Sequence, residues 1–341
     1  MRLIRVSATE KGIHMETKNN LLEVNDLYVE YSSEEETVKA VNGVSFKLGA
    51  GETLGLVGET GAGKTSIAKA ILRILPDPPA KIPAGSIYFD GHDLLKIPEN
   101  EMRKIRGERI SMIFQDPMTA LNPVITVGEQ ISEAISVHQK VSKAEAARIG
   151  EKMLEMVGIP AERYTEYPHQ FSGGMKQRVV IAIALACNPD LLIADEPTTA
   201  LDVTIQAQVL NLIHELQQKK NMSMILITHD FGIVAETCNR VGVIYAGEII
   251  EYGTLEQVFE SPTHPYTVGL FGSIPSLTSE VDKLYNIPGM PCDPTHLPTG
   301  CKFAPRCSHA CPECSKDIRI PLADLGNGHT CRCLFAENFS R

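Results

Sequence analysis

The chain has 341 residues, of which 43% are hydrophobic and 22% charged, proportions that are typical of a soluble globular protein. This length allows one large domain with an appendage. The formal net charge of −10 counts against a nucleic-acid partner, because phosphate binding requires surfaces rich in Lys and Arg. No apolar run approaches the roughly 18 residues that suggest a membrane span, and no signal peptide is evident. We therefore expect a cytoplasmic protein, with residues 1–20 as a disordered extension.

The first part of the chain predicts strands around one helix. Residues 21–57 alternate apolar and polar side chains, which indicates antiparallel strands that end in a short buried strand at 54–57. Ile67, Ile71 and Leu75 have helical spacing, so we expect a helix from Lys64 to the residue before Pro76. Residues 85–95 are typical of a further hairpin.

The middle of the chain, residues 126–170, has helical periodicity, and Ser142 with Glu145 predicts a capping box at the start of one helix. After Ser172, helices and strands alternate. The expected elements are a helix, a strand (191–194), a helix (205–218), a strand (224–228) and a final hairpin (241–252). This order implies an α/β fold with a mostly parallel sheet that helices cover on both faces.

The composition changes near residue 260. Proline becomes frequent after Ser261, and seven of the nine cysteines follow it. They are Cys292, Cys301, Cys307, Cys311, Cys314, Cys331 and Cys333. In a cytosolic chain such a cluster indicates metal or redox chemistry before structural disulfides. We expect residues 261–341 to form a small Pro- and Cys-rich C-terminal domain with a regulatory or metal-binding role.

A phosphate-binding loop is predicted between the strand at 54–57 and the helix from Lys64. Its residues are Gly58, Glu59, Thr60, Gly61, Ala62, Gly63, Lys64 and Thr65. In this pattern backbone N–H groups and the positive end of the helix dipole bind phosphate oxygens. Lys64 is expected to contact the β- and γ-phosphates, Thr65 to ligate Mg²⁺, and Ser66 to complete an ATP site.

An acidic pair, Asp195 and Glu196, ends the apolar strand at 191–194. Asp195 is expected to hold Mg²⁺ directly or through water, and Glu196 to polarise the water that attacks the γ-phosphate. The alternative interpretation is an exposed, solvated acidic pair at a strand end.

Residues 171–178 contain the turn that distinguishes the class of ATPase. Ser172, Gly173 and Gly174 open a helix, where a hydroxyl and backbone N–H groups suit a phosphate. This octet resembles the signature motif of ATP-binding-cassette (ABC) ATPases, and the resemblance implies that the phosphate is the γ-phosphate of a nucleotide held mainly by another subunit. The resemblance implies an ABC-type P-loop NTPase fold, with a RecA-like core, an antiparallel β subdomain and a helical subdomain at about 116–172. The nucleotide-binding domain would span residues 21–260.

The same resemblance assigns further roles. Gln115 matches the Q-loop, which senses the metal and the water, and His229 matches the switch histidine near the γ-phosphate. Asp202, after Ala200 and Leu201, matches the D-loop that crosses to the partner subunit. Tyr31 stands where an aromatic side chain stacks on adenine. Gln115, Glu196 and His229 would form the catalytic set, with ATP and Mg²⁺ as ligands.

Three segments resemble the peptide/nickel group of ABC importers more specifically, and within it the D-type ATPase subunits. They are residues 115–123, 261–267 and 300–307. Met175 stands where most cassettes carry Gln, and D-type subunits share this Met while their F-type partners keep Gln. The resemblance therefore implies a heterodimer with an F-type ATPase subunit, although homodimers of the purified chain remain open. It also implies two transmembrane permeases, an extracytoplasmic peptide-binding protein, and a location at the cytoplasmic face of the inner membrane.

In this family the cysteine pattern aligns with Cys301, Cys307, Cys314 and Cys333, where some members resemble a [4Fe–4S] module. Four thiolates suit Zn²⁺ equally well, and a tail without metal is the third alternative. Cys311 and Cys331 are close enough in sequence to substitute as ligands. Other functions stay open too: a soluble ABC ATPase in DNA repair, an iron–sulfur assembly scaffold, or transport of nickel or another solute.

Overall fold

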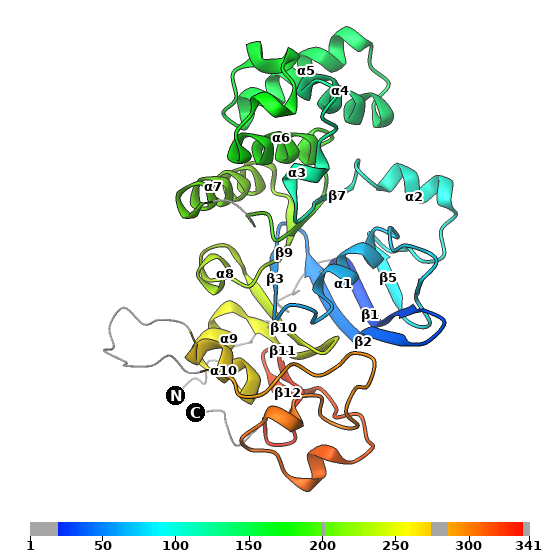
Figure 1. Ribbon diagram of the computed structural model, residues 1–341, viewed down its shortest axis with the longest axis vertical. Coiled ribbons are helices and arrows are strands. Elements are labelled where there is room, and N and C mark those ends of the chain that lie inside the picture. Colours follow the sequence, from blue (N-terminus) through cyan, green and yellow to red (C-terminus); the bar gives the residue numbers. More distant parts are fainter. Residues whose placement is uncertain (1–19, 199–201, 274–285, 337–341) are drawn as a thin grey trace, which may run out of the picture.

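The computed structural model describes residues 20–198, 202–273 and 286–336. The molecule is elongated, with the green helices of residues 117–185 at one end and the orange and red C-terminal segment at the other (Figure 1). Within the described ranges, no helix is both long enough and apolar enough to cross a membrane.

An eight-stranded sheet runs through the molecule in the order β12-β13-β11-β10-β3-β9-β8-β7. The five neighbouring strands from β10 to β7 are parallel, which confirms the mostly parallel sheet predicted from the alternation of strands and helices. These central strands and their antiparallel neighbour are β3 (Thr53–Val57), β7 (Ile110–Ile113), β8 (Leu191–Asp195), β9 (Ser223–Ile227), β10 (Arg240–Tyr245) and β11 (Glu248–Thr254).

Alternate side chains of the central strands enter two separate apolar clusters. Leu54 and Leu56 of β3 pack with α1 (Lys64–Ile71) and the small antiparallel sheet. Leu192 and Ala194 of β8 pack into the cluster that includes α6 (Gly173–Leu185), α7 (Val203–Lys220) and α8 (Phe231–Thr237). Because side chains alternate along a strand, both faces of this sheet are buried, as parallel sheets require.

A second sheet is antiparallel, in the order β2-β1-β5-β6 with β4 beside β1. Its strands are β1 (Asn20–Ser32), β2 (Thr37–Gly49), β4 (Ala80–Lys81), β5 (Ser86–Phe89) and β6 (His92–Asp93), and α2 (Glu99–Ile105) follows them. The early antiparallel strands and the hairpin at 85–95 are thus confirmed. Helix α1 is shorter than predicted, because the left-handed Arg73 turns the chain and donates to the carbonyl oxygens of Leu94 and Ile97.

The helical part lies between β7 and α6, as α3 (Pro117–Ala120), α4 (Val127–His138), α5 (Lys143–Met156), η1 (Ala161–Thr165) and η2 (Pro168–Gln170). Ser142 caps α5 by accepting the Glu145 N–H, as predicted. The predicted capping box is wrong in its second half, since the Glu145 carboxylate pairs with Arg148 at 2.6 Å. A complete box instead opens α4, from Thr126 and Glu129.

The C-terminal part extends the sheet of the cassette. It contains α9 (Leu255–Glu260), α10 (Pro265–Gly272), η3 (Ala304–Arg306), η4 (Pro312–Ser315), β12 (Ala323–Gly326) and β13 (His329–Cys331). β12 and β13 form a hairpin that the proline-rich sequence did not predict, and β13 pairs with β11.

A buried carboxylate fixes this junction. Glu251 of β11 is fully buried and accepts the backbone N–H groups of Thr263 (2.7 Å) and His264 (2.9 Å). The same carboxylate contacts His329 Nε2 of β13 at 2.9 Å. A buried acceptor that satisfies several donors specifies one arrangement, because losing it would leave those donors unpaired.

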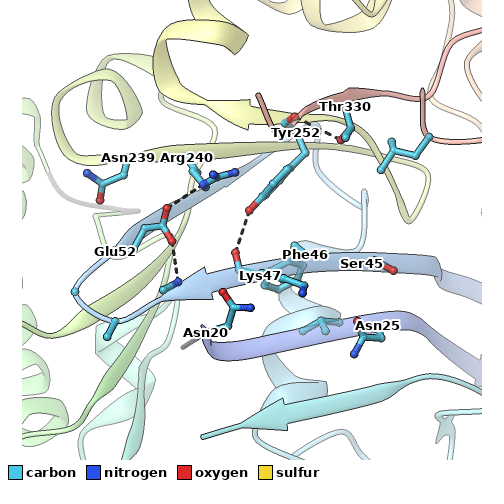
Figure 2. Close-up of a pocket in the computed structure, with 16 residues that line it drawn as sticks. Asn20, Asn25, Ser45, Phe46, Lys47, Glu52, Asn239, Arg240, Tyr252 and Thr330 are labelled. Carbon is cyan, nitrogen blue, oxygen red and sulfur yellow. Dashed lines mark hydrogen bonds and ion pairs between the residues drawn. The ribbon is translucent and has the colours of Figure 1, made fainter. Parts of the chain in front are cut away.

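An open cavity of about 670 Å³ lies where β1 and β2 approach β10, β11 and the C-terminal strands. Figure 2 shows the contacts that cross it: Glu52 pairs with Arg240 at 3.0 Å, and the Tyr252 hydroxyl donates to the Lys47 carbonyl oxygen at 3.0 Å. The residues predicted to bind ATP do not line this cavity.

Candidate active site

The phosphate loop joins β3 to α1, and its glycines are required by close backbone approaches. Gly58 has φ 153°, and a Cβ there would lie 2.1 Å from the Ile244 carbonyl oxygen. Gly63 has φ 100°, and a Cβ there would lie 2.2 Å from the Ala40 carbonyl oxygen. A side chain at either position would push the loop away from the sheet, so glycine sets the shape that cradles phosphates.

The ammonium of Lys64 is held over this loop. Its buried side chain donates to the carbonyl oxygens of Gly58 (2.7 Å) and Glu59 (3.0 Å). Burial lowers the pKa of Lys64, while the nearby Glu196, Asp195 and Glu59 oppose that shift. A partly desolvated cation favours an anionic ligand, which supports the predicted phosphate contact.

Asp195 ends β8 and is 2% exposed. Burial raises the pKa of its carboxyl group, Thr65 opposes that shift through a hydrogen bond, and Glu196 adds to it. Among the described residues, Asp195 Oδ1 meets no hydrogen-bond partner. Asp195 lines a cavity of about 390 Å³ together with Thr65 and Gln115. A buried anionic oxygen beside a hydroxyl and an amide fits Mg²⁺, which prefers oxygen ligands.

Glu196 lies between the two other residues predicted to be catalytic. Gln115 Nε2 donates to Glu196 Oε2 at 2.8 Å, and His229 Nδ1 lies 3.6 Å from Glu196 Oε1. The Glu196 backbone is left-handed, with φ 45°, which costs roughly 1–2 kcal/mol for a non-glycine residue. Such strain is typical of functional sites, where it orients a side chain.

The signature residues lie apart from this site. Ser172 caps α6 by accepting the Met175 N–H, and both Ser172 and Gly173 are exposed. Of the residues described, those that line the cavities beside Asp195 and Glu196 include none of residues 172–175. Figure 1 places α6 with the other green helices, whereas α1 lies beside the antiparallel sheet. The signature is therefore available to another subunit.

Arg163 contacts the residues on both sides of the signature turn, a role that the sequence did not indicate. Its guanidinium lies 4.3 Å from the Phe171 ring centroid and donates to the Gln170 carbonyl oxygen at 3.0 Å. It also lies 3.3 Å from Met175 Sδ. A lone arginine in a helical region gives no sequence signal for this role.

The remaining predicted residues have identifiable contacts. The Tyr31 hydroxyl hydrogen bonds with the Ser66 hydroxyl at 3.0 Å, and adenine stacking by Tyr31 stays a prediction. Asp202 caps α7 by accepting the Ile205 N–H at 3.0 Å. The other two residues of the predicted D-loop, Ala200 and Leu201, lie outside the described residues.

The predicted metal site in the tail finds no support in ligand geometry: within the described ranges, no group of three or more His, Cys, Asp or Glu side chains suits a metal ion. Four thiols nevertheless line one small cavity, those of Cys301, Cys307, Cys314 and Cys333. The two possible substitute ligands, Cys311 and Cys331, do not line this cavity. Cys331 is fully buried in β13, and Cys311 Sγ lies 3.6 Å from Cys314 Sγ. Burial raises the pKa of Cys301 to about 11, so its thiol is neutral at pH 7.

Two residues of the C-terminal segment that follows residue 260, here called the tail, contact the phosphate loop. Arg306 forms a two-point ion pair with Glu59, at 2.8 and 3.1 Å, and the Tyr266 hydroxyl accepts the Glu59 N–H at 3.0 Å. Both lie in segments noted above for their family resemblance, but no pattern in the sequence connects them with residue 59.

The fold and site together define an ABC ATPase. Four groups meet at one edge of the parallel sheet: the phosphate loop after β3, a glutamine after β7, a histidine after β9, and the buried Asp at the end of β8 with the strained Glu that follows it. A Ser-Gly-Gly helix start lies apart from them. The general family model for ABC transporters matches residues 41–199. The ATP-binding cassette MJ0796, solved as a dimer in a post-hydrolysis state with ADP and phosphate, is 26% identical with a TM-score of 0.62. That match covers 69% of this chain and 98% of the cassette.

More specific similarity extends through the tail. The family model for the oligopeptide/dipeptide transporter C-terminal region matches residues 250–314. The dipeptide transport ATP-binding protein DppD of Bacillus subtilis is 52% identical over 315 residues, which are 92% of this chain and 94% of that protein. The oligopeptide transport ATP-binding protein OppD of Salmonella typhimurium is 51% identical over 315 residues, 92% of this chain and 93% of its own length. The chain belongs to the family of dipeptide and oligopeptide transport ATP-binding proteins. This membership does not favour the DNA-repair and cluster-assembly alternatives.

Replacing Asp195 by Asn is expected to stabilise the protein and to inactivate it. Burial raises the pKa of Asp195 in the folded state, so at pH 7 its ionised form lowers the stability of the fold. The variant should therefore melt at a higher temperature without Mg²⁺. This gain should shrink as pH falls and vanish below about 4, the pKa of an unfolded aspartate. ATP hydrolysis should fall by about 100-fold or more, since the predicted ionic ligand of Mg²⁺ is lost.

Asp190→Asn is the matched control, because Asp190 precedes the same strand but is exposed and paired with Arg109 at 2.7 Å. This control should keep its turnover and gain no stability. An Asp195→Asn variant that melts lower than the wild type at pH 7 would contradict the electrostatic account.

Proposed function

We propose that this chain is the ATP-hydrolysing subunit that powers uptake of dipeptides or oligopeptides through an ABC importer. The observation that carries the proposal is the similarity at 52% identity to a dipeptide transport ATP-binding protein across 94% of its length, tail included. The geometry of the site supports the ATPase part, because Gln115 and His229 both contact Glu196. The solute itself would be selected by other subunits.

The residues of the site have separable tasks. Lys64 and the N–H groups of the phosphate loop bind the phosphates of ATP, and Glu196 orients the attacking water and accepts its proton. Gln115 and His229 hold the Glu196 carboxylate in place. Thr65, Gln115 and Asp195 would hold Mg²⁺, which neutralises phosphate charge when bound. Tyr31 is proposed to stack on adenine.

The site is proposed to be completed by a second subunit. Ser172, Gly173 and Gly174 stand exposed or partly exposed at a helix start, where an N-terminus favours a phosphate. ATP between two subunits would hold a closed dimer, and hydrolysis would release it. We infer that the physiological dimer pairs this chain with an F-type ATPase subunit, on the basis of Met175.

The further assembly follows from the same proposal. Residues 21–260 act as the nucleotide-binding domain, and their helical part, about 116–172, would contact two permease subunits at the cytoplasmic face of the inner membrane. An extracytoplasmic peptide-binding protein would deliver the solute. Exposed apolar side chains of the helical part, among them Val124 and Val137, support such a contact.

The variant Glu196→Gln tests the mechanism. It should bind ATP with normal affinity, and in the assembled dimer its site should lose turnover, because the amide cannot accept a proton, so the ATP-bound dimer should accumulate. Size-exclusion chromatography with MgATP measures the dimer, and phosphate release measures turnover. Full turnover by this variant would contradict the mechanism.

The same measurement separates the two proposed dimers. ATP-dependent dimerisation of the Glu196→Gln chain alone supports a homodimer. A dimer that forms only after an F-type subunit is added supports the heterodimer.

We propose that the tail cysteines hold a [4Fe–4S] cluster rather than Zn²⁺. The family pattern supports the proposal, because the four cysteines that it selects, Cys301, Cys307, Cys314 and Cys333, line one small cavity. Four thiolates would hold such a cluster. Its role would be structural or redox-sensing, since none of the catalytic set lies among the residues that line this cavity.

Anaerobic purification with iron, sulfide and zinc analysis tests this assignment. The wild type should contain iron and sulfide in equal amounts and show the visible absorbance of a cluster. Cys314→Ser should lose both, whereas Cys292→Ser should retain them, because Cys292 does not line the cavity. One zinc per chain without iron would overturn the proposal in favour of zinc, and neither metal would favour a metal-free tail.

A further inference from the structure

Glu59, the second residue of the phosphate loop, is bonded through all of its polar groups. Its carboxylate pairs with Arg306 (2.8 and 3.1 Å), and its N–H donates to the Tyr266 hydroxyl (3.0 Å). Its carbonyl oxygen accepts from Lys64 Nζ (3.0 Å) and from the Ala62 N–H (3.2 Å). Two of these four connections stay inside the loop, and the other two lead to the C-terminal segment.

Arg306 is held as firmly as the residue that it binds. Its side chain is 6% exposed, and its Nε donates to the Pro288 carbonyl oxygen at 3.0 Å. The guanidinium also lies near two aromatic rings, 5.8 Å from the Tyr245 centroid and 5.9 Å from the Phe303 centroid. Because a planar guanidinium that is fixed on several sides presents its fork in one direction, the pair with Glu59 has a defined geometry.

Tyr266 is fixed in the same way. Its side chain is fully buried at the start of α10, and its ring packs against Tyr245 (4.7 Å between centroids) and Phe303 (5.3 Å). Because the ring is fixed by this packing, the Tyr266 hydroxyl contacts Glu59 from a fixed position. The two contacts with Glu59 share one aromatic cluster, formed by Tyr245, Tyr266 and Phe303.

The charge of Glu59 gives these contacts a consequence for nucleotide binding. A carboxylate within a loop that receives a triphosphate repels it, and burial strengthens that repulsion. Arg306 neutralises the carboxylate and turns it toward the tail. The Lys64 ammonium, which touches the same residue, is then left to favour the phosphates.

We propose that Arg306 and Tyr266 are positioning residues of the ATP site, which hold Glu59 so that the phosphate loop keeps its shape and does not present a negative charge to ATP. The C-terminal segment is thereby a working part of the nucleotide site, in addition to any metal that its cysteines hold. The inference rests on the proposed role of the loop in binding ATP.

The short helix η3 connects the cysteine cavity with the ion pair between Arg306 and Glu59. This short helix supplies Ala304 to the wall of the cysteine cavity and Arg306 to the ion pair, and Cys307 follows directly. A shift of η3 that accompanies any change at the thiols would therefore also move Arg306 relative to Glu59.

A double-mutant cycle on the full-length chain tests the inference, with the dissociation constant of a non-hydrolysable ATP analogue as the readout. Arg306→Met should weaken binding by about tenfold, because it leaves the Glu59 carboxylate uncompensated. Arg306→Lys, which restores the charge, should recover most of that loss. Glu59→Gln removes the repulsion, so Arg306→Met in that background should change the affinity by less than about threefold.

Arg319→Met is the matched control. Arg319 also ties the tail to the cassette, by pairing with Asp26 at 3.0 Å and donating to the Gly43 carbonyl oxygen, but it contacts the antiparallel sheet. This variant should keep wild-type affinity. Tyr266→Phe, which keeps the ring and removes the hydroxyl, should weaken binding with little change in melting temperature.

Three results would count against the proposals in distinguishable ways. If Arg306→Met lowers the melting temperature but leaves the dissociation constant unchanged, Arg306 is only structural and the inference fails. Equal effects of Arg306→Met with Glu59 or Gln at position 59 would overturn it as well. Wild-type affinity in Lys64→Ala would instead contradict the proposed ATP site itself.

Discussion

The site depends on one constraint, that the carboxyl ends of parallel strands meet at a single edge of the sheet. β3, β7, β8 and β9 are neighbours in the parallel sheet, and the phosphate loop, Gln115, Asp195 with Glu196, and His229 follow them in turn. Residues up to 171 positions apart in sequence, as Gly58 and His229 are, therefore converge without any long-range recognition of their own. Placing reactive groups at this edge is the general solution of open α/β sheets.

The site is built at a cost to stability. Asp195 is a buried carboxylate whose pKa burial raises, Lys64 is a buried cation whose pKa burial lowers, and Glu196 has a left-handed backbone. Each of these features is unfavourable in the protein without its ligand, and each becomes favourable when a metal and a polyphosphate arrive. The two apolar faces of the central sheet and the buried Glu251 contacts offset that cost elsewhere.

The sequence predicted what depends on local patterns. The phosphate loop, the strand before Asp195 and the alternation of strands and helices all come from neighbouring residues, and their positions agree with the structure. The end of α1 was missed because it depends on Arg73, whose donors bind carbonyl groups more than 20 residues away. The capping box was half wrong because Arg148 competes for Glu145.

Contacts between distant segments could not be predicted, because they do not follow from the pattern of neighbouring residues. The pair of Glu59 with Arg306 joins residues 247 positions apart, and only the packing of the tail against the cassette brings them together. The hairpin of β12 and β13 depends likewise on pairing with β11. The four cysteines are an exception, because the family pattern predicted which distant thiols line the same cavity. The pattern did not predict the distances between these thiols.

The central claim is that one chain supplies the phosphate loop and another the signature to each ATP site. The most direct test is the variant Ser172→Arg, which blocks the signature and leaves the phosphate loop intact. ATP affinity of the monomeric chain and hydrolysis by the assembled dimer are measured side by side. The account predicts wild-type ATP affinity in the monomer together with loss of hydrolysis in the dimer. Undiminished hydrolysis, or loss of ATP binding by the folded monomer, would contradict it.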